Sequence, residues 1–255
     1  MARRNAGRTV QSDDTLFDIV EFIRDRDRVG VTDIATELDI AKSTVHAHLT
    51  TLSQRGYVVN DDGEYRIGLQ FLRHGIHAQT SNDLYSIAKK KVTQLAQETG
   101  ERAWCHVEEN GVAYYLCGAE GEHPVRPPVQ VGEWVHLHQI SGGKAILAHL
   151  PEERTREIID RYGLPAKTDH TITDEAALFE TLDGIRQRGY AFNEEESLRG
   201  LHAVGAPVRE ADGPVRGALS VSGPANRLTG EKFREELPEL LLGATNELEI
   251  NITYS

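Results

Sequence analysis

Hydrophobic positions in the first 80 residues recur at helical spacing and then change to a period of two. The spacing predicts helices at about residues 14–27, 31–38 and 42–54, because apolar side chains three or four positions apart share one helix face. After residue 56, two alternating segments flank Asp61-Asp62-Gly63, which is typical of the tight turn of a β-hairpin. Three helices followed by a hairpin are the parts of a winged helix-turn-helix.

The rest of the chain mixes helical and strand-like periods. A linking helix is predicted at about residues 68–79, and Ser81-Asn82-Asp83 offers the cap of a long helix that ends at Gly100. Beyond it, the pattern predicts strands at about residues 102–107, 112–118, 203–209 and 216–222, and helices at about residues 142–149, 151–162, 175–188 and from 229 onward. The predicted class is therefore α+β, with a small helical domain before a larger α/β domain.

The two cysteines are too few for a disulfide scaffold. A two-residue turn at Asn110-Gly111 places Cys105 opposite Leu116 rather than Cys117, so we expect the thiols to lie apart. No apolar run approaches the roughly 20 residues of a membrane span. The basic start of the chain is not followed by the apolar segment of a secretory signal. We expect a cytoplasmic protein that contacts no membrane.

Charge changes the picture in two ways. The 255 residues carry a formal charge of −12, with 21 arginines against 7 lysines. An acidic, lysine-poor chain is typical of adaptation to high intracellular salt, although an ordinary acidic protein is the alternative. The acidic total disfavours loose attraction to nucleic acid. Residues 41–60, however, contain no Asp or Glu, so a nucleic-acid interface has to rest on this locally basic segment.

The third predicted helix has a polar face suited to the major groove of DNA. Its apolar stripe of Val45, Leu49 and Leu52 would pack inside, and the opposite face carries small polar side chains that can bond phosphates or base edges. The candidate DNA-contacting residues are Lys42, Ser43, Thr44, His46, Ala47, Thr50 and, on the hairpin, Arg66. A protein-interaction module of the same shape is the alternative.

The hairpin tip and the N-terminus add weaker candidates. Asp61 and Asp62 at the tip would repel phosphate, so Tyr65 or Arg66 is the better candidate for a wing contact. A basic arm over residues 1–12, with Arg3, Arg4 and Arg8, could follow the DNA backbone or enter a minor groove.

Several motifs resemble the IclR family of transcriptional regulators. They are Lys42-Ser43-Thr44-Val45-His46 with Gly56-Tyr57-Val58, the segment 138–148, and the longer signature over residues 189–196, 206–208 and 217–224. The resemblance implies a winged helix-turn-helix at 13–68, a linker helix at 69–82 and a GAF-like effector-binding domain at 83–255. It also implies a homodimer or homotetramer on a palindromic operator. The family usually has an arginine where this chain has Ala47, and some members have a cysteine at Ala203.

The resemblance places a ligand pocket at Ser141, Gly142, Asn193, Leu201, Ala203, Ser220 and Ser222. The residue types fit this role, because Ser141-Gly142-Gly143 opens a helix with exposed N–H groups, and Ser220 and Ser222 share one face of a strand. They supply hydroxyls and amides without fixed charge, suited to a small polar or anionic ligand. Tight turns and packing are the alternative explanation for these small residues.

Enzymatic and metal-binding interpretations find less support. Lys144 could form a Schiff base, but a solvated residue in the first turn of a helix is the simpler expectation. His136 and His138 would share a face of a possible strand, yet no paired zinc motif accompanies them. Glu194-Glu195-Glu196 is typical of a capped, solvated turn. We expect no catalysis, no cofactor and no metal site.

The sequence therefore predicts a DNA-binding transcriptional regulator whose operator affinity is controlled by a small carboxylate or polar metabolite in its C-terminal domain. Two alternatives stay open, a ligand-sensing protein-interaction module that binds no DNA and a metabolite-binding enzyme.

Overall fold

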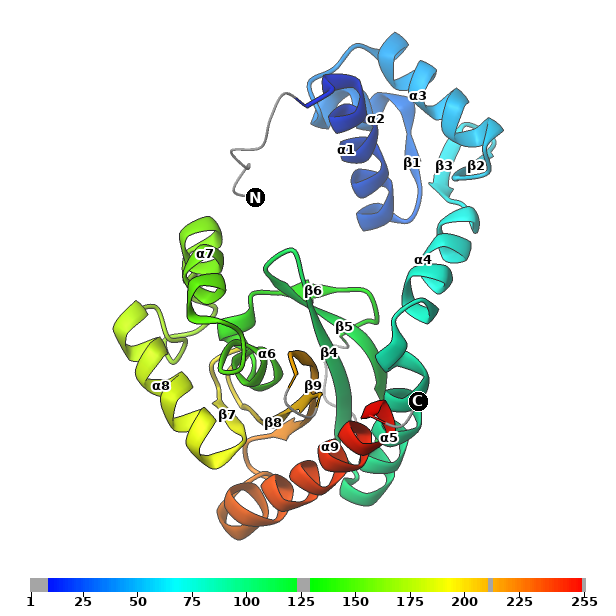
Figure 1. Cartoon of the computed structure of the whole chain (residues 1–255). Helices are drawn as coiled ribbons and strands as arrows, with labels where there is room; N and C mark the ends of the chain where they lie inside the picture. The colour runs from blue at the N-terminus through cyan, green and yellow to red at the C-terminus, as the bar shows by residue number, and fades with distance from the viewer. Residues whose placement is uncertain (1–8, 123–128, 211–212, 254–255) are drawn as a thin grey trace. The chain divides into compact units, whose positions relative to one another are not determined.

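The computed structural model describes residues 9–122, 129–210 and 213–253 (Figure 1). Contacts within the chain divide it into two compact units, residues 1–79 and 80–255. No helix in these described ranges combines the length and the apolar composition that a membrane span requires.

The first unit contains the predicted helices and hairpin. Its elements are α1 (Gln11–Arg26), β1 (Val29–Gly30), α2 (Val31–Glu37), α3 (Lys42–Gln54), β2 (Val58–Asp61), β3 (Glu64–Ile67) and α4 (Gln70–Thr80). The strands form an antiparallel sheet in the order β1-β3-β2. Asp62 and Gly63 have φ angles of 53° and 94°, the left-handed values that a two-residue hairpin turn requires. The predicted β-hairpin is confirmed, and the short strand β1 extends it.

The core of the first unit fixes the orientation of α3. Ile19 and Ile23 of α1 and Ile34 of α2 pack with Val45 and Leu49 of α3, and all five side chains are fully buried. Because these α3 residues share one face, the opposite face of the helix points into solvent. Burial of five large aliphatic side chains stabilises this arrangement by about 1.5–3 kcal/mol each.

The second unit is built on a six-stranded antiparallel sheet (Figure 1). Its strands are β4 (Arg102–Glu109), β5 (Val112–Ala119), β6 (Trp134–Val135), β7 (Ala191–Glu194), β8 (Leu201–Arg209) and β9 (Val215–Pro224), in the order β6-β5-β4-β9-β8-β7. Its helices are α5 (Asp83–Thr99), α6 (Ser141–Leu147), α7 (Glu152–Tyr162), α8 (Glu175–Arg188) and α9 (Leu237–Thr253). Short helical turns at Leu137–Gln139 and Lys232–Glu236 precede α6 and α9.

Helices cover both faces of this sheet. One hydrophobic core packs α5 and α9 against the inner residues of β4, β8 and β9, and a second core packs α6 and α8 on the other face. The predicted ends of α5 are confirmed, since Asn82 accepts a hydrogen bond from the Leu84 N–H and Gly100 ends the helix in a left-handed conformation. The predicted α+β class, with a small helical unit before an α/β unit, is confirmed.

The predicted separation of the two cysteines is wrong. Cys105 of β4 is paired with Cys117 of β5, because the ladder shifts by one residue between Cys105 and His106. Regular pairing from the Asn110-Gly111 turn would have set Cys105 opposite Leu116, and the β-bulge moves this partner along by one. Both thiols are free and buried on the face of the sheet that α5 covers.

Candidate DNA interface and ligand pocket

The outer face of α3 presents the predicted DNA-contacting residues together. Val45, Leu49 and Leu52 are buried, and the other face is open to solvent. The exposed residues on it are Lys42, Ser43, Thr44, His46, Ala47 and Thr50. The first turn of α3 carries no acidic residue, so its free backbone N–H groups and Lys42 can meet a phosphate without repulsion.

Two threonines of α3 have hydroxyl groups that are already used. The Thr50 hydroxyl donates to the His46 carbonyl at 2.7 Å, and the Thr51 hydroxyl donates to the Ala47 carbonyl at 3.0 Å. In this arrangement Thr50 offers its methyl group and the lone pairs of its oxygen to the outside. Thr50 is therefore suited to contact a thymine methyl or to accept a hydrogen bond from a base amino group.

The hairpin of β2 and β3, which would form the wing, is less available for contact with DNA than α3. Arg66 pairs with Asp61, with Nε at 3.1 Å from Oδ2, and Arg28 approaches the same carboxylate oxygen at 3.4 Å. A phosphate would have to share Arg66 with Asp61. Tyr65 is buried and accepts a hydrogen bond from the Asn60 amide, which leaves Arg66 as the candidate for a wing contact. Arg3, Arg4 and Arg8 of the predicted arm lie outside the described residues.

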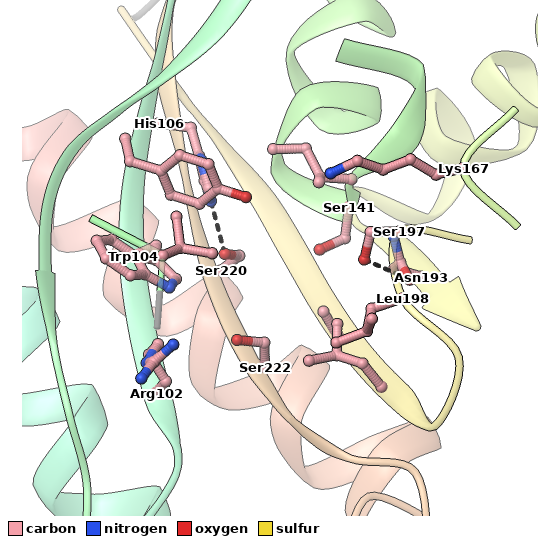
Figure 2. Close-up of a pocket in the computed structure, with 15 residues that line it drawn as sticks. Arg102, Trp104, His106, Ser141, Lys167, Asn193, Ser197, Leu198, Ser220 and Ser222 are labelled. Carbon is pink, nitrogen blue, oxygen red and sulfur yellow. Dashed lines mark hydrogen bonds between the residues drawn. The ribbon is translucent and has the colours of Figure 1, made fainter. Parts of the chain in front are cut away.

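A cavity of about 160 Å³ lies in the second unit (Figure 2). Six of the seven residues proposed for the ligand pocket line it, namely Ser141, Asn193, Leu201, Ala203, Ser220 and Ser222. Gly142 does not line it. A Cβ atom on Gly142 would lie 2.4 Å from Cδ2 of His106, so the glycine lets this ring pack against the start of α6.

Strand β4 supplies a wall that sequence reasoning missed. Arg102, Trp104 and His106 alternate along β4 and all line the cavity. In the ladder between β4 and β9, Arg102 is opposite Ser222 and Trp104 is opposite Ser220. The period of two was visible in the sequence, but only the pairing of β4 with β9 brings this face to the two serines.

His106 forms a neutral polar end of the cavity. Its Nε2 is 2.8 Å from the Ser220 hydroxyl, and burial lowers the pKa of His106 to about 3. The ring is therefore uncharged at neutral pH. Its Nδ1 is buried and has no hydrogen-bond partner within the described part of the chain.

Arg102 gives the opposite end a positive charge, and Figure 2 shows it beside Ser222. The residue is only 4% exposed, and one terminal amino group donates to Glu120 at 2.5 Å. Its Nε–H is buried without a partner among the described residues. Lys167 also lines the cavity. Sequence reasoning found only pocket residues without fixed charge and missed these cations, because they come from segments that carried no recognised motif.

Aromatic rings form part of the cavity wall. The Trp104 and Tyr115 ring centroids lie 4.9 Å apart, and those of His106 and Tyr115 lie 4.8 Å apart, both in edge-to-face geometry. Burial is the main cause that raises the pKa of Tyr115 to about 12, so this hydroxyl stays protonated. The cavity thus combines an apolar wall, a buried cation and several neutral polar groups.

Three further expectations need correction. Lys144 is not solvated but only 2% exposed, and it pairs with Glu196, which is itself buried rather than part of a solvated turn. His136 and His138 do not share a strand, because β6 ends at Val135 and a helical turn follows. Within the described ranges, no group of three or more His, Cys, Asp or Glu side chains is arranged to hold a metal ion.

Comparison with known proteins matches both units. Residues 14–62 match the IclR helix-turn-helix domain, and residues 76–249 match the bacterial transcriptional regulator IclR C-terminal domain. The chain is 34% identical over 239 residues to the probable HTH-type transcriptional regulator ArcR of Halobacterium salinarum. The aligned region covers 92% of this chain and 91% of that protein.

Two solved structures extend the match. The IclR protein of Thermotoga maritima is 27% identical, covers 95% of this chain and 98% of its own, and has a TM-score of 0.81. The inducer-binding domain of a PobR transcription factor double mutant from Acinetobacter, in complex with 3-hydroxybenzoic acid, is 28% identical. It covers 64% of this chain and 96% of its own, with a TM-score of 0.59.

An exposed recognition helix in one unit and a small-molecule cavity in the other define a DNA-binding transcriptional regulator with an effector-binding domain. The chain belongs to the IclR family. It is a regulator and not an enzyme. Of the three functions that the sequence left open, the DNA-binding transcriptional regulator is therefore the one that these matches support.

Proposed function

We propose that the chain binds a palindromic operator as a homodimer or homotetramer and that a small aromatic carboxylate in the cavity sets its operator affinity. The observation that carries this proposal is the cavity itself. It pairs a buried, incompletely satisfied guanidinium, Arg102, with a wall of aromatic rings.

The size and chemistry of the cavity support one aromatic ring with an acidic group. An engineered apolar cavity of about 150 Å³ is known to hold benzene, and the cavity here has about 160 Å³. Arg102 would bind the carboxylate, Trp104 and Tyr115 would contact the ring, and the neutral polar groups of His106 and Ser220 would meet a hydroxyl at the far end. The relative from Acinetobacter, which was solved with 3-hydroxybenzoic acid, supports the same class of ligand.

The outer face of α3 would lie in the major groove. Two copies of α3 in a dimer would meet half-sites about 34 Å apart. Ser43 and Thr50 would contact base edges, Ala47 would allow close approach to a thymine methyl, and Lys42 would bind a phosphate. Arg66 would join only by sharing its contact with Asp61.

An apolar stripe on α4 supports the oligomer. Leu69, directly before α4, and Leu72 and Ile76 of α4 recur at helical spacing and are 78%, 57% and 50% exposed. Large apolar side chains gathered on one helix face mark a surface that another protein covers. Isologous contact between two copies of this stripe would place two α3 helices on one duplex.

The effector would act by binding two dimer geometries with unequal affinity. Such a difference is required, since a ligand that binds both states equally shifts neither. The geometry that spaces the α3 helices correctly would hold the operator, and the other would release it.

The test is a DNA-binding titration by fluorescence anisotropy at the salt concentration of the cell. The duplex carries the sequence upstream of the protein's own gene, and a scrambled duplex serves as the control. We expect preferential binding to the first duplex and a change in its affinity on addition of 3-hydroxybenzoate. Equal affinity for both duplexes would refute the operator proposal, and an unchanged affinity with bound 3-hydroxybenzoate would refute the coupling.

A further inference from the structure

A buried ion pair lies directly behind the wall of the cavity. Lys144 of α6 and Glu196, in the segment after β7, are 2% and 8% exposed. The Lys144 ammonium contacts both carboxylate oxygens of Glu196, with Nζ at 2.5 Å from Oε1. Neither residue lines the cavity, and the DNA-binding role assigned above uses neither of them.

Stability alone is a weak reason for this pair. Burial lowers the pKa of Lys144, and the charge of Glu196 opposes that effect only in part. Buried ion pairs are often no more stabilising than apolar side chains of the same volume, whereas their geometry is directional. The directional geometry of the pair can instead hold the segment around Glu196 in place.

Glu196 sits in a segment that forms part of the cavity wall. Asn193, Ser197 and Leu198 all line the cavity (Figure 2). The Glu196 N–H donates to Asn193 Oδ1 at 3.2 Å, and the Asn193 amide donates to the Gln139 carbonyl at 2.7 Å. The side chain of Glu196 and its backbone thus anchor this segment from opposite sides.

A second wall segment is attached at the same point. The Thr168 hydroxyl donates to the Glu195 carbonyl and the Thr171 hydroxyl donates to the Glu196 carbonyl, each at 2.7 Å. Lys167, the residue before Thr168, lines the cavity. Residues 165–171 and 195–200 lie in no helix or strand, so side-chain hydrogen bonds add to a few backbone hydrogen bonds in defining their conformation.

We propose that the Lys144–Glu196 ion pair is a positioning element of the effector site, which fixes both wall segments so that Asn193, Ser197, Leu198 and Lys167 face the ligand. The inference rests on the proposed function insofar as the cavity binds an effector. Lys144 acts here through Glu196 and does not touch the ligand. Loss of the pair would loosen the wall and weaken effector binding while the fold of the unit remains.

The first experiment measures hydrogen–deuterium exchange in the full chain without ligand. Lys144→Met removes the pair, and Arg154→Met, which removes a more exposed ion pair, is the control. Arg154 pairs with Glu108 at 3.0 Å in the same unit, and neither of these two residues lines the cavity. We expect Lys144→Met to accelerate exchange about tenfold or more in residues 166–171 and 194–200, with strands β4 and β9 unchanged. The control should leave both segments protected.

Two results would overturn the proposal at this stage. Exchange in both segments could stay at the wild-type rate, or it could rise equally throughout the second unit, as expected for general destabilisation. Because Lys144→Met leaves Glu196 buried without a partner, the double variant Lys144→Met/Glu196→Met is measured beside it. Two apolar side chains restore packing without restoring the directional contact.

The second experiment titrates 3-hydroxybenzoate into the same proteins by calorimetry. We expect about tenfold weaker binding for both the single and the double variant, although the double variant regains thermal stability. Affinity that recovers together with stability would show a merely structural role and overturn the proposal. If the wild-type protein binds no 3-hydroxybenzoate, the proposed ligand class fails, and the exchange experiment still decides whether the ion pair positions the wall.

Discussion

At the scale of single residues, burial controls the charge states of two histidines in the second unit, of which His106 lines the cavity and His138 does not. Burial lowers the pKa of His106 to about 3 and that of His138 to about 4, so both rings are neutral in the folded protein at neutral pH. The guanidinium of Arg102 lies at the opposite end of the cavity from His106. The cavity therefore offers two cations, Lys167 and the buried Arg102, beside neutral hydrogen-bonding groups, which suits a small acid.

The two histidines predict a dependence of stability on pH. In the unfolded chain a histidine binds its proton near pH 6.5, whereas the folded protein holds His106 neutral down to about pH 3. The unfolded state therefore binds more protons in this window, and the free energy of unfolding falls as the pH drops below 6.5. The slope reaches up to about 1.4 kcal/mol per pH unit for each histidine.

The check is denaturant unfolding at pH 7, 6 and 5, followed by tryptophan fluorescence. Both tryptophans, Trp104 and Trp134, lie in the second unit, so the signal reports on that unit alone. His106→Gln should flatten the slope, and His46→Gln, on the exposed face of α3, should not. An unchanged slope in His106→Gln would contradict the prediction.

Arg102 predicts a preference for charged ligands. Arg102→Met should weaken binding of benzoate about 10- to 100-fold, because a charge-assisted hydrogen bond is lost from a buried site. Benzamide has the same shape without the charge, so its affinity should change little. Calorimetric titration of both ligands measures the difference, and equal losses for the two would assign Arg102 a packing role instead.

The residues of the ligand cavity could be predicted only where a local sequence pattern or motif contains them. The resemblance to a family gave Ser220, Ser222 and Asn193, and the strand period added that the two serines share one face. Arg102 could not be found in this way, since its place depends on the pairing of β4 with β9. Lys144 was predicted to be solvated because nothing near it in sequence shows that Glu196, 52 residues away, closes over it.

At the scale of elements, α3 is held by its buried stripe and leaves its polar face free. The hydroxyl of Thr50 is bound to the His46 carbonyl, so the methyl group is the part that faces outward with least cost. Thr50 can therefore contact a thymine methyl through its own methyl group, or its hydroxyl oxygen can accept a hydrogen bond from a base amino group. The sequence alone does not distinguish these two modes of base recognition.

Substitution of Thr50 tests the mode of contact. Thr50→Val keeps the methyl group and should retain operator affinity, whereas Thr50→Ala removes it and should bind about fourfold more weakly, equivalent to about 0.8 kcal/mol for one buried methyl group. Neither change should affect a scrambled duplex. Fluorescence anisotropy with both duplexes measures this, and equal losses for Val and Ala would show that the hydroxyl oxygen reads the base.

The elements themselves followed from the sequence where a period repeats for several turns. The helix α8 spans Glu175–Arg188, the predicted range, because its caps and apolar spacing agree. The strands β1 and β6 contain two residues each and carry no period, so only pairing with a neighbouring strand defines them. The β-bulge in β5 escaped prediction for the same reason, since the position of an extra residue depends on packing across the whole sheet.

At the scale of the whole molecule, charge is divided unequally. Residues 1–80 hold 10 basic and 12 acidic residues, and residues 81–255 hold 18 and 28, so the net charges are −2 and −10. The nearly neutral first unit can approach DNA, while the acidic remainder limits unspecific attraction. At high salt the release of counterions contributes little affinity, so base contacts would have to carry more of the specificity.

The oligomer can be tested through the stripe on α4. Leu72→Glu places a charge on a side chain that is 57% exposed in the isolated chain, so it should leave the fold intact. If two copies meet there, buried carboxylates would repel each other, and both the oligomer and operator binding should weaken about tenfold or more. Ala78→Glu, on the opposite side of the same helix, is the control.

Sedimentation velocity and fluorescence anisotropy measure these two effects. An unchanged oligomeric state in Leu72→Glu would exclude this stripe as the contact. Weaker operator binding in Ala78→Glu to the same extent would show that charge on α4, and not contact between copies, causes the effect.

The extra residue in β5 decides which residue lies opposite Trp104, a side chain that lines the cavity. The shift sets Gly118 opposite Trp104, and a Cβ atom there would lie 2.2 Å from the indole ring. A relative that lacks one residue at Leu116 would keep the tryptophan flat over a glycine. A relative that keeps the residue but straightens the strand would bring Cys117 beneath the ring and tip it into the ligand space. Loss of the bulge without loss of a residue would therefore change the ligand space without any substitution among the residues that line it.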